Sequence, residues 1–444
     1  MSKPTDIERV SQNRVVKLFK DELNYTYLGD WEEREGNSNI EEEYLTKYLK
    51  RKGYSDAHII KAIFELQQVA TNFSDSLYTT NKNVYSKLRN GVKVKVSAGE
   101  NYDTVKLINW QTPEDNDFYI AEEVTYKGNK TKRPDIVLYI NGIAIAVLEL
   151  KRGIVDIGEG IRQNITNMQD RFIQPFFATN QILFSGNDSE GLRYGTISSP
   201  EKFYLSWKED LEDNSRLMLD KYLIKMCSKE RIIELLYDFI VFDAGIKKLP
   251  RVHQYFGVKE SQKYVNRYEG GIIWHTQGSG KSISMVYLAK WILESNPKAR
   301  IAIVTDRDEL DKQIEDVFTD SGETIFRTKS GRDLMGKLGQ PSPRLLCSLV
   351  HKFGKKDVAN FEKYLTELRE NPVQVSGELF VFVDECHRTQ SGKLHKTMKA
   401  MLPNARKDEL ASFAIDLVVV PTTPFFANNS KEISSISCLR FISD

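Results

Sequence analysis

Two stretches of this sequence carry residue types that could act on phosphates. In the first, an apolar run (Ile272 to Trp274) leads into a glycine loop and then into a helix-like run. This order is typical of a phosphate-binding P-loop, because glycines let backbone N–H groups face a phosphate at the positive end of a helix. We predict that Lys281 reaches the β- and γ-phosphates of a nucleotide and that Ser282 holds Mg²⁺. The loop residues expected to line the same site are Thr276, Gly278, Ser279 and Gly280.

This sequence departs from the P-loop pattern at one position, and the stretch has one alternative interpretation. The pattern G-x-x-x-x-G-K-[ST] requires glycine at position 275, where this chain has His275. The alternative is a glycine loop beside a buried strand that binds no ligand. A second observation favours nucleotide binding, since the apolar run Leu379 to Val383 ends in Asp384-Glu385. At the strand ends of a parallel α/β sheet, Asp384 would share Mg²⁺ with Ser282, and Glu385 would polarise the attacking water.

The second stretch contains two apolar runs separated by Asn141-Gly142. This is a strong β-hairpin signal, because a type I′ turn needs positive φ at both central positions. The hairpin brings Asp135, at the start of its first strand, to the same end as Glu149 and Lys151, which close the second strand. Glu149 and Lys151 share one face because side chains alternate along a strand.

Two carboxylates and a lysine at a dry strand end suit metal-assisted hydrolysis. Asp135 and Glu149 would hold Mg²⁺, and Lys151 would orient water or stabilise negative charge that develops on a phosphate. A perfect two-residue turn would leave Asp135 on the face opposite Glu149, so we expect a bulge or strong twist near Pro134. The alternative is a surface salt bridge at the mouth of the hairpin, which would contribute little.

Composition restricts the class of protein. The chain has 444 residues, with 63 Lys and Arg against 62 Asp and Glu, so any nucleic-acid binding must come from local basic patches. The four cysteines are scattered without a C-x-x-C pair, which argues against a zinc ribbon or disulfide framework and suits a reducing cytoplasm. Neither a leader nor an apolar run of about 18 residues is evident, so we expect no membrane association.

The length predicts two or three domains, and a Gly-, Lys- and Pro-containing connection at 243–251 suggests where they meet. We expect an N-terminal domain at 1–245 and an α/β nucleotide-binding domain at 246–444. In the N-terminal domain we expect residues 1–22 to be frayed. The helices that follow are expected to support the domain and to carry no catalytic residues. Leu217 to Ile240 is predicted to form one long helix.

These motifs together resemble a known family. Asp384-Glu385-Cys386-His387 is similar to motif II of superfamily 2 helicases, and Pro134-Asp135 with Glu149-x-Lys151 resembles the PD-(D/E)xK nuclease core. A nuclease followed by such a motor resembles the restriction (motor and endonuclease) subunit of type I restriction-modification enzymes. The resemblance covers the chain to about Pro403 and includes the stretches TKRPDIVLYING, EGIRQN, NDSEGLRYGTI, PRVHQYFGV and IIWHTQGSGKS.

The resemblance implies roles for further residues. It implies a PD-(D/E)xK domain, a mixed sheet flanked by helices, followed by a RecA-like parallel α/β lobe that uses ATP and Mg²⁺. Gln163 matches a glutamine that assists the nuclease site, whereas the tyrosine expected four residues later is Asn167. Gln254 matches an adenine-reading glutamine, and Arg307 follows motif I where contacts to DNA are usual. The alternatives are that both glutamines are ordinary surface amides and that Arg307 caps a strand.

The end of the chain departs from the family pattern. Pro421-Thr422-Thr423-Pro424 stands where Thr-Gly-Thr-Pro is expected, with threonine at the position of the glycine. The second motor lobe is missing, so we expect a truncated form that binds ATP but hydrolyses it poorly alone. The implied partners are double-stranded DNA and the methyltransferase and specificity subunits, although docking of those subunits is in doubt in a short form. Two other hypotheses are an inactive nucleotide-binding remnant and a repair helicase–nuclease.

Overall fold

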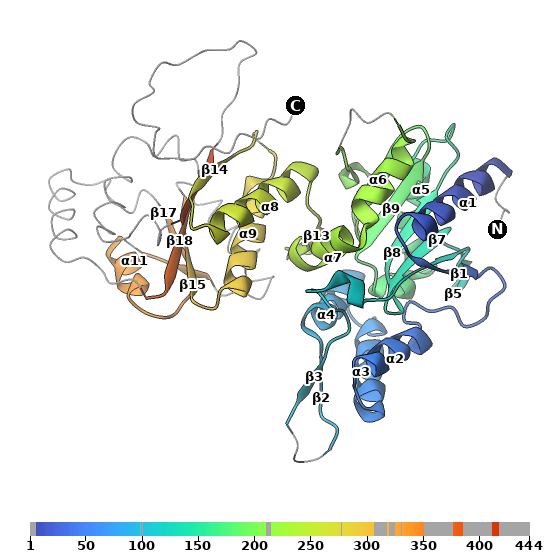
Figure 1. Cartoon of the computed structure of the whole chain (residues 1–444), viewed down its shortest axis with the longest axis horizontal. Helices are drawn as coiled ribbons and strands as arrows, with labels where there is room; N and C mark the ends of the chain where they lie inside the picture. The colour runs from blue at the N-terminus through green and yellow to red at the C-terminus, as the bar shows by residue number, and fades with distance from the viewer. Residues whose placement is uncertain are drawn as a thin grey trace, which may run out of the picture. The chain divides into compact units, whose positions relative to one another are not determined.

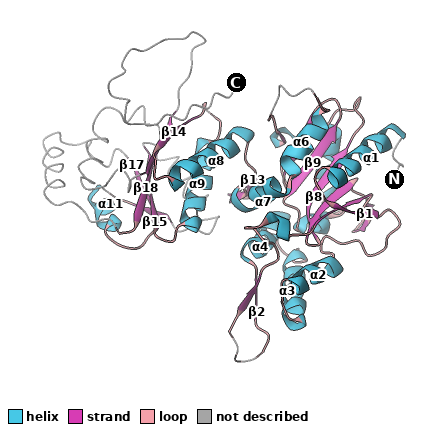
Figure 2. Cartoon of the chain, in the orientation of Figure 1, coloured by secondary structure: helices cyan, strands magenta, loops and turns pink. Residues whose placement is uncertain are grey.

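The computed structural model describes residues 6–97, 99, 101–209, 215–276, 278–305, 318, 325–329, 331–349, 376–384 and 411–416. The chain divides into two compact units, Met1–Val252 and His253–Asp444 (Figure 1). Both combine helices with a sheet, as the sequence predicts (Figure 2). No helix of the described residues is long and apolar enough to cross a bilayer.

A mixed seven-stranded sheet forms the centre of the N-terminal unit, in the order β1-β4-β7-β8-β9-β10-β11. β1 pairs parallel with β4 and β8 pairs parallel with β9, whereas the other neighbours are antiparallel. The strands are β1 (Thr26–Asp30), β4 (Phe118–Glu122), β7 (Ile136–Ile140), β8 (Ile143–Leu150), β9 (Ile182–Asn187), β10 (Gly191–Gly195) and β11 (Leu205–Ser206). Three two-stranded hairpins accompany it: β2 (Val92–Val94) with β3 (Asp103–Val105), β5 (Tyr126–Lys127) with β6 (Thr131–Lys132), and β12 (Val241–Asp243) with β13 (Ile246–Lys248).

The β7–β8 hairpin has the predicted turn and an irregular register. Asn141 and Gly142 have φ values of 53° and 88°, as a type I′ turn requires. Tyr139 pairs with Ala144 but Leu138 pairs with Ala146, so Ile145 is the extra residue of a bulge. The bulge therefore lies close to the turn and not near Pro134, and it shifts all later pairs by one position.

Helices cover the sheet of the N-terminal unit. They are α1 (Asp6–Asp21), α2 (Glu42–Arg51), α3 (Asp56–Ala70), α4 (Leu77–Asn90), α5 (Gly158–Asn167), α6 (Met218–Cys227) and α7 (Lys229–Asp238), with short 3₁₀ turns η1 (Pro113–Asp115), η2 (Gln174–Ala178) and η3 (Glu201–Phe203). The interpretation of residues 1–22 as frayed was wrong for residues 6–21, because α1 buries Val15 and Phe19 completely. The single helix expected over 217–240 is two helices, because Ser228 ends α6 and its side chain caps α7 by accepting from Arg231 N.

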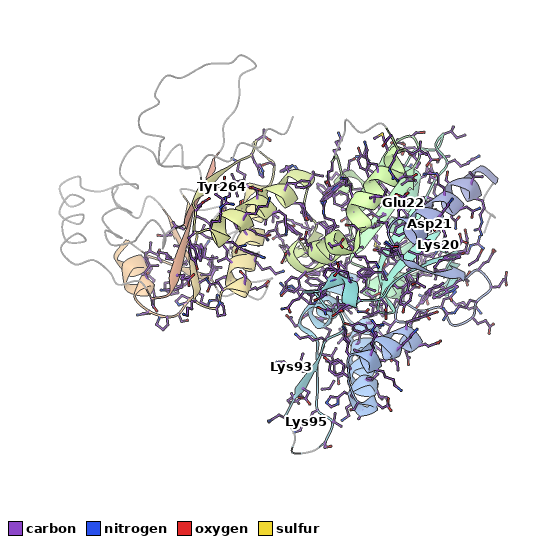
Figure 3. All side chains as sticks on the ribbon, viewed as in Figure 1. Lys20, Asp21, Glu22, Lys93, Lys95 and Tyr264 are labelled. Carbon is purple, nitrogen blue, oxygen red and sulfur yellow. The ribbon has the colours of Figure 1, made fainter. Side chains whose placement is uncertain are left out.

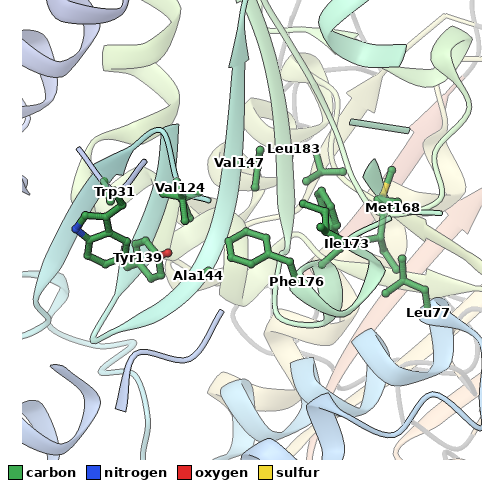
Figure 4. Packing of buried hydrophobic residues seen from close by; sticks show 14 of the residues in the cluster. Trp31, Leu77, Val124, Tyr139, Ala144, Val147, Met168, Ile173, Phe176 and Leu183 are labelled. Carbon is green, nitrogen blue, oxygen red and sulfur yellow. The ribbon is translucent and has the colours of Figure 1, made fainter. Parts of the chain in front are cut away.

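One face of the sheet forms a core with α5 and η2. Figure 4 shows Val147 and Leu183 from the central strands near Phe176 and Ile173, with Tyr139 and Trp31 at one end and Met168 and Leu77 at the other. Tyr139 and Val137 of β7 lie in this core together with Ala144 and Val147 of β8. Ala144 and Val147 are three residues apart, so they share a face only because the bulge reverses the alternation between them.

A parallel six-stranded sheet forms the second unit, in the order β14-β19-β18-β15-β17-β16. The strands are β14 (Gly271–Trp274), β15 (Ala299–Thr305), β16 (Ile325–Arg327), β17 (Leu345–Leu349), β18 (Glu378–Asp384) and β19 (Ala411–Asp416). The helices α8 (Val252–Asn266), α9 (Lys281–Ser295) and α11 (Gly331–Leu338) accompany it. This agrees with the parallel α/β sheet predicted for the region.

Candidate functional site

The open end of the β7–β8 hairpin brings Asp135 and Glu149 together. Ile136 pairs with Leu148, so the next residues outward, Asp135 and Glu149, lie opposite each other and continue the core face of Val137 and Val147. They are close enough that the charge of Asp135 and a side-chain hydrogen bond with it both raise the pKa of Glu149. The bulge at Ile145 thus resolves the problem that a regular hairpin would pose, in which the two carboxylates would point to opposite faces.

Lys151 completes this group. Its Nζ atom lies 3.9 Å from Asp135 Oδ2 and donates to Leu150 O at 2.9 Å. Asp135 Oδ2 also accepts from Leu150 N at 2.7 Å, which fixes the carboxylate against the neighbouring strand. The side chains of Lys151 and Asp135 are 15% and 19% exposed, and Glu149 is fully buried. The group is therefore not an exposed surface salt bridge.

Helix α5 supplies two amides to Glu149. Gln163 Nε2 donates to Glu149 Oε2 at 2.6 Å, and Asn167 Nδ2 donates to Glu149 Oε1 at 3.5 Å. The two residues are four positions apart, which places them on one face of the helix. Gly160 allows the helix this close, since a Cβ atom there would lie 2.3 Å from Ser185 Oγ and 3.4 Å from Glu149 Cβ. Gln163 is therefore not an ordinary surface amide, and Asn167 contacts the same carboxylate.

The electrostatics favour a proton or a cation between the two carboxylates. Burial, followed by the charge of Asp135, raises the pKa of Glu149 well above its usual value, while Lys151 acts in the opposite direction. Two carboxylates that face each other in a dry position repel when both are ionised. A divalent cation would remove that repulsion, and carboxylate oxygens are ligands that Mg²⁺ accepts. The donor set therefore fits Mg²⁺, although the described residues contain no group of three or more His, Cys, Asp or Glu side chains placed to hold a metal ion.

A buried charged network beside this pair was missed by the sequence analysis. Glu123 is 2% exposed, has a positive φ of 52°, and donates its backbone N–H to Asp135 O at 2.9 Å. Its carboxylate binds Arg133 Nε at 2.7 Å and Gln12 Nε2 at 3.0 Å. Gln12 belongs to α1 and also contacts Asp135 O at 3.4 Å. The signal in the sequence was the Glu122-Glu123 pair at the end of an apolar strand, a pattern too common to single out.

The loop after β14 contains two glycines at positive φ directly before a helix. Gly278 and Gly280 have φ values of 77° and 86°, and α9 begins directly after Gly280 at Lys281. Thr276 and Gly278 are exposed, Lys281 and Ser282 are half-buried, and Ser279 is buried with no hydrogen-bond partner for its hydroxyl among the described residues. A helix N-terminus, a lysine and an unsatisfied hydroxyl fit a nucleotide phosphate.

Gln254 packs against this loop. It is 4% exposed, and its Nε2 atom donates to Ser279 O at 2.9 Å and Gly280 O at 3.0 Å. A Cβ atom on Gly280 would lie 2.4 Å from Gln254 Nε2, so both the positive φ and the close contact require glycine there. Gln254 is thus a buried residue of the loop region, not a surface amide.

His275, which replaces the first glycine of the P-loop pattern, is buried directly before the loop. It is 3% exposed, and its ring stacks edge to face on His253 with the ring centroids 4.9 Å apart. Burial, with smaller contributions from His253 and Lys281, lowers the pKa of His275 to about 4. The side chain is therefore neutral at pH 7 and does not compete with Lys281 for a phosphate.

The backbone register places Asp384 near the loop. Trp274, which precedes the loop, pairs with Asp416, and Ile415 pairs with Asp384. Asp384 thus ends its strand at the same edge of the sheet as the loop, two strands away, at about 10 Å. Glu385 and Arg307 lie outside the described residues, so their predicted roles stay predictions.

Comparisons with known proteins identify relatives for both units. Residues 7–202 match the family model described as type I restriction enzyme R protein N terminus, and residues 253–409 match the SWI2/SNF2 ATPase model. A protein of Methanocaldococcus jannaschii named as a type I restriction enzyme endonuclease subunit (MjaIXP) is 28% identical over 89% of this chain and 41% of its own length. The type I restriction enzyme HindI endonuclease subunit of Haemophilus influenzae is 28% identical over 74% of this chain and 34% of its own length.

These comparisons confirm the family resemblance stated from the sequence. The chain spans between about a third and two fifths of the length of these two relatives. Among solved structures, the UvsW helicase from Bacteriophage T4 aligns over 53% of this chain and 92% of its own, with 15% identity and a TM-score of 0.29.

Proposed function

We propose that this chain, a relative of the endonuclease subunits of type I restriction enzymes, cleaves DNA with its N-terminal unit and binds ATP with its second unit. The observation that carries the nuclease proposal is the fully buried Glu149 beside Asp135, with Lys151 Nζ 3.9 Å from Asp135 Oδ2. Such a group serves hydrolysis of a phosphodiester better than it serves stability, because burying like charges is costly.

The residues of this site have distinct tasks in the proposed reaction. Asp135 and Glu149 would hold Mg²⁺, which when bound supplies a Lewis acid for the phosphate and lowers the pKa of a water molecule. Lys151 presents its ammonium group beside Asp135, where it stabilises the negative charge that develops on the phosphate oxygens. Gln163 and Asn167 each donate to one oxygen of Glu149, so they orient that carboxylate. The assignment to the PD-(D/E)xK class rests on this arrangement.

The second unit would bind ATP at the loop of residues 276–282. Thr276, Gly278, Ser279 and Gly280 would surround the phosphates with backbone N–H groups, Lys281 would neutralise the β- and γ-phosphates, and Ser282 with Asp384 would hold Mg²⁺. Glu385 would polarise the attacking water, and Gln254 would contact the adenine. Arg307 would contact DNA.

In the cell we propose a role in restriction. The chain would act on double-stranded DNA in the cytoplasm, with methyltransferase and specificity subunits as partners, and ATP hydrolysis would drive DNA through the complex. The support is the naming of the relatives as type I restriction enzyme endonuclease subunits.

A plasmid-nicking assay tests the nuclease proposal. Supercoiled plasmid is incubated with the 444-residue chain and Mg²⁺, with a chelator as the blank, and the relaxed and linear products are measured. We expect Asp135→Asn and Lys151→Ala to lower the cleavage rate by at least about 100-fold. Lys298→Ala, an exposed lysine of the second unit, is the control. Full cleavage by Asp135→Asn would move the active site elsewhere, and a wild-type chain that does not cleave would leave the alternative of a nucleotide-binding protein without cleavage.

A further inference from the structure

Three cationic side chains gather around one aromatic ring of the N-terminal unit. Measured to the centroid of the Phe172 ring, Lys132 Nζ lies at 4.5 Å, Arg171 Cζ at 5.0 Å and Lys130 Nζ at 5.6 Å. Lys130 and Arg171 are exposed, and Lys132 and Phe172 are partly exposed. We call these four residues the Phe172 patch. The negative face of the ring favours each cation, but it does not cancel their mutual repulsion.

Backbone contacts hold the patch together. Lys130 and Lys132 belong to the β5–β6 hairpin, whereas Arg171 and Phe172 belong to the loop that follows α5. Asn129 joins the two segments, because its N–H donates to Phe172 O at 3.0 Å and its side-chain amide donates to Asp170 O at 2.7 Å. The cations are therefore clustered by the fold.

The three cations lack carboxylate partners among the described residues. Neighbouring cations differ, since Arg133 binds Glu123 at 2.7 Å and Lys127 lies 3.9 Å from Glu35. The Arg171 side chain donates from Nε to Gln169 Oε1 at 2.8 Å, a neutral acceptor. The Asp170 carboxylate accepts a hydrogen bond from the backbone N–H of Arg171, with Arg171 N and Asp170 Oδ1 2.7 Å apart. The patch therefore keeps a local positive charge in a chain whose net charge is only +1.

Both segments of the patch lead directly to the acidic pair. Lys132 is three residues before Asp135, a span of at most about 10 Å for an extended chain. On the other side, Ile173, next to Phe172, donates its N–H to Asn167 O at 3.2 Å, and the Asn167 side chain contacts Glu149. A polyanion that binds the patch would thus pass beside the carboxylates.

We propose that the Phe172 patch binds the phosphodiester backbone of duplex DNA next to the nuclease site. Duplex DNA carries one phosphate per about 3.4 Å of axis on each strand, so a span of about 10 Å corresponds to roughly three nucleotides. Flexible lysines and an arginine that binds no carboxylate among the described residues contact phosphates without reading bases. The biological role of the patch rests on the proposed nuclease function, but the binding of DNA to the patch is measurable without cleavage.

The test is the salt dependence of DNA binding by the full chain. A fluorescein-labelled 30-base-pair duplex of arbitrary sequence is titrated by anisotropy in EDTA, between about 50 and 200 mM NaCl, so that cleavage does not interfere. We expect the variant Lys130→Ala/Lys132→Ala/Arg171→Ala to bind at least about 10-fold more weakly at 100 mM NaCl. The slope of log Kobs against log[NaCl] should become shallower by about 2.7, or about 0.9 for each phosphate contact.

Two control variants separate the patch from net charge and from folding. Lys20→Ala/Lys47→Ala/Lys93→Ala removes the same charge from exposed positions on α1, α2 and β2, and should leave the slope within about 0.5 of the wild-type value. Figure 3 labels Lys20 and Lys93 on these separate elements. Lys130→Arg/Lys132→Arg/Arg171→Lys keeps the charge and should keep the wild-type slope.

Several results would overturn the proposal. An unchanged slope in the alanine variant would do so, as would an equal change in the control variant with lysines removed elsewhere. If poly-glutamate bound to the patch while the affinity for duplex DNA did not depend on the patch, the patch would be a binding surface for an acidic protein. Failure of the proposed nuclease function can be told apart from failure of the proposed DNA-binding patch. In the first case Asp135→Asn would cleave as well as the wild type, while the DNA affinity would still depend on the Phe172 patch.

Discussion

The acidic end of the β7–β8 hairpin and the loop after β14 arrange polar groups in different ways. At the hairpin, side chains from two strands and a helix meet, and the fully buried Glu149 takes hydrogen bonds from Gln163 and Asn167. At the loop, a contiguous segment uses its own backbone, with Gly278 and Gly280 at positive φ. The first site therefore depends on long-range packing, and the second depends mainly on local conformation.

This difference predicts different sensitivities to substitution. A carboxylate held by neighbours should respond to changes in residues that never contact substrate. A loop that presents backbone N–H groups should respond to loss of its lysine or to a side chain added at a glycine, and less to its surroundings. The following changes test this comparison.

The largest effect is expected at Lys281. Lys281→Ala removes the cation that we propose binds the phosphates, so ATP affinity should fall about 100-fold, or about 3 kcal/mol. Titration with a fluorescent ATP analogue measures it, with Lys298→Ala as the control. Plasmid nicking in the absence of ATP should stay unchanged, and unchanged affinity would refute the P-loop role.

The second largest effect concerns the side-chain amides that donate hydrogen bonds to Glu149. Gln163→Ala should lower the Mg²⁺-dependent nicking rate by about 30-fold and Asn167→Ala by about 5-fold, because Gln163 makes the shorter contact, 2.6 Å against 3.5 Å. Both variants should also need more Mg²⁺ for half-maximal rate, a shift that a general loss of stability would not cause. Equal effects of both variants, or none, would contradict this view of the site.

A smaller effect is expected at Gly280. Gly280→Ala introduces a side chain at φ 86° and 2.4 Å from Gln254 Nε2, so nucleotide affinity should fall about 10-fold. Gly278→Ala, at φ 77° with no atom within 4 Å of the added Cβ, introduces the strain without the clash and should lower the affinity less. The same titration decides it, and an equal loss in both variants would show that the contact with Gln254 is unimportant.

The smallest effect is a pH dependence of the free energy of unfolding, caused by Lys247. Lys247 is buried, donates to Asn81 Oδ1 at 2.8 Å and also to Gln181 Oε1, and burial lowers its pKa well below its usual value. Between the folded and unfolded pKa values the unfolded chain binds more protons, so the free energy of unfolding should rise with pH up to about 10. Lys247→Gln, which keeps a donor, should remove this rise.

Urea denaturation at several pH values, followed by tryptophan fluorescence, measures the effect at Lys247. Lys93→Gln, at an exposed position of β2, is the control and should keep the wild-type pH dependence. A slope that persists in Lys247→Gln would assign the pH dependence to other groups.

Local patterns in the sequence determined much of this protein. The turn at Asn141-Gly142, the glycine loop before Lys281 and the apolar strand that ends at Asp384 depend on neighbouring residues, so their residue types were sufficient to predict them. The α/β class and the family resemblance follow from the order of these patterns.

Tertiary structure decided how the acidic pair is built. The bulge at Ile145 sets which face Asp135 and Glu149 share, and it depends on how β8 packs between β7 and β9. Gln12, Glu123 and Asn167 join the site from three other segments, and no local pattern predicts that these segments meet there. A residue type and its neighbours fix local conformation, whereas the pairing of distant segments depends on the packing of the whole core.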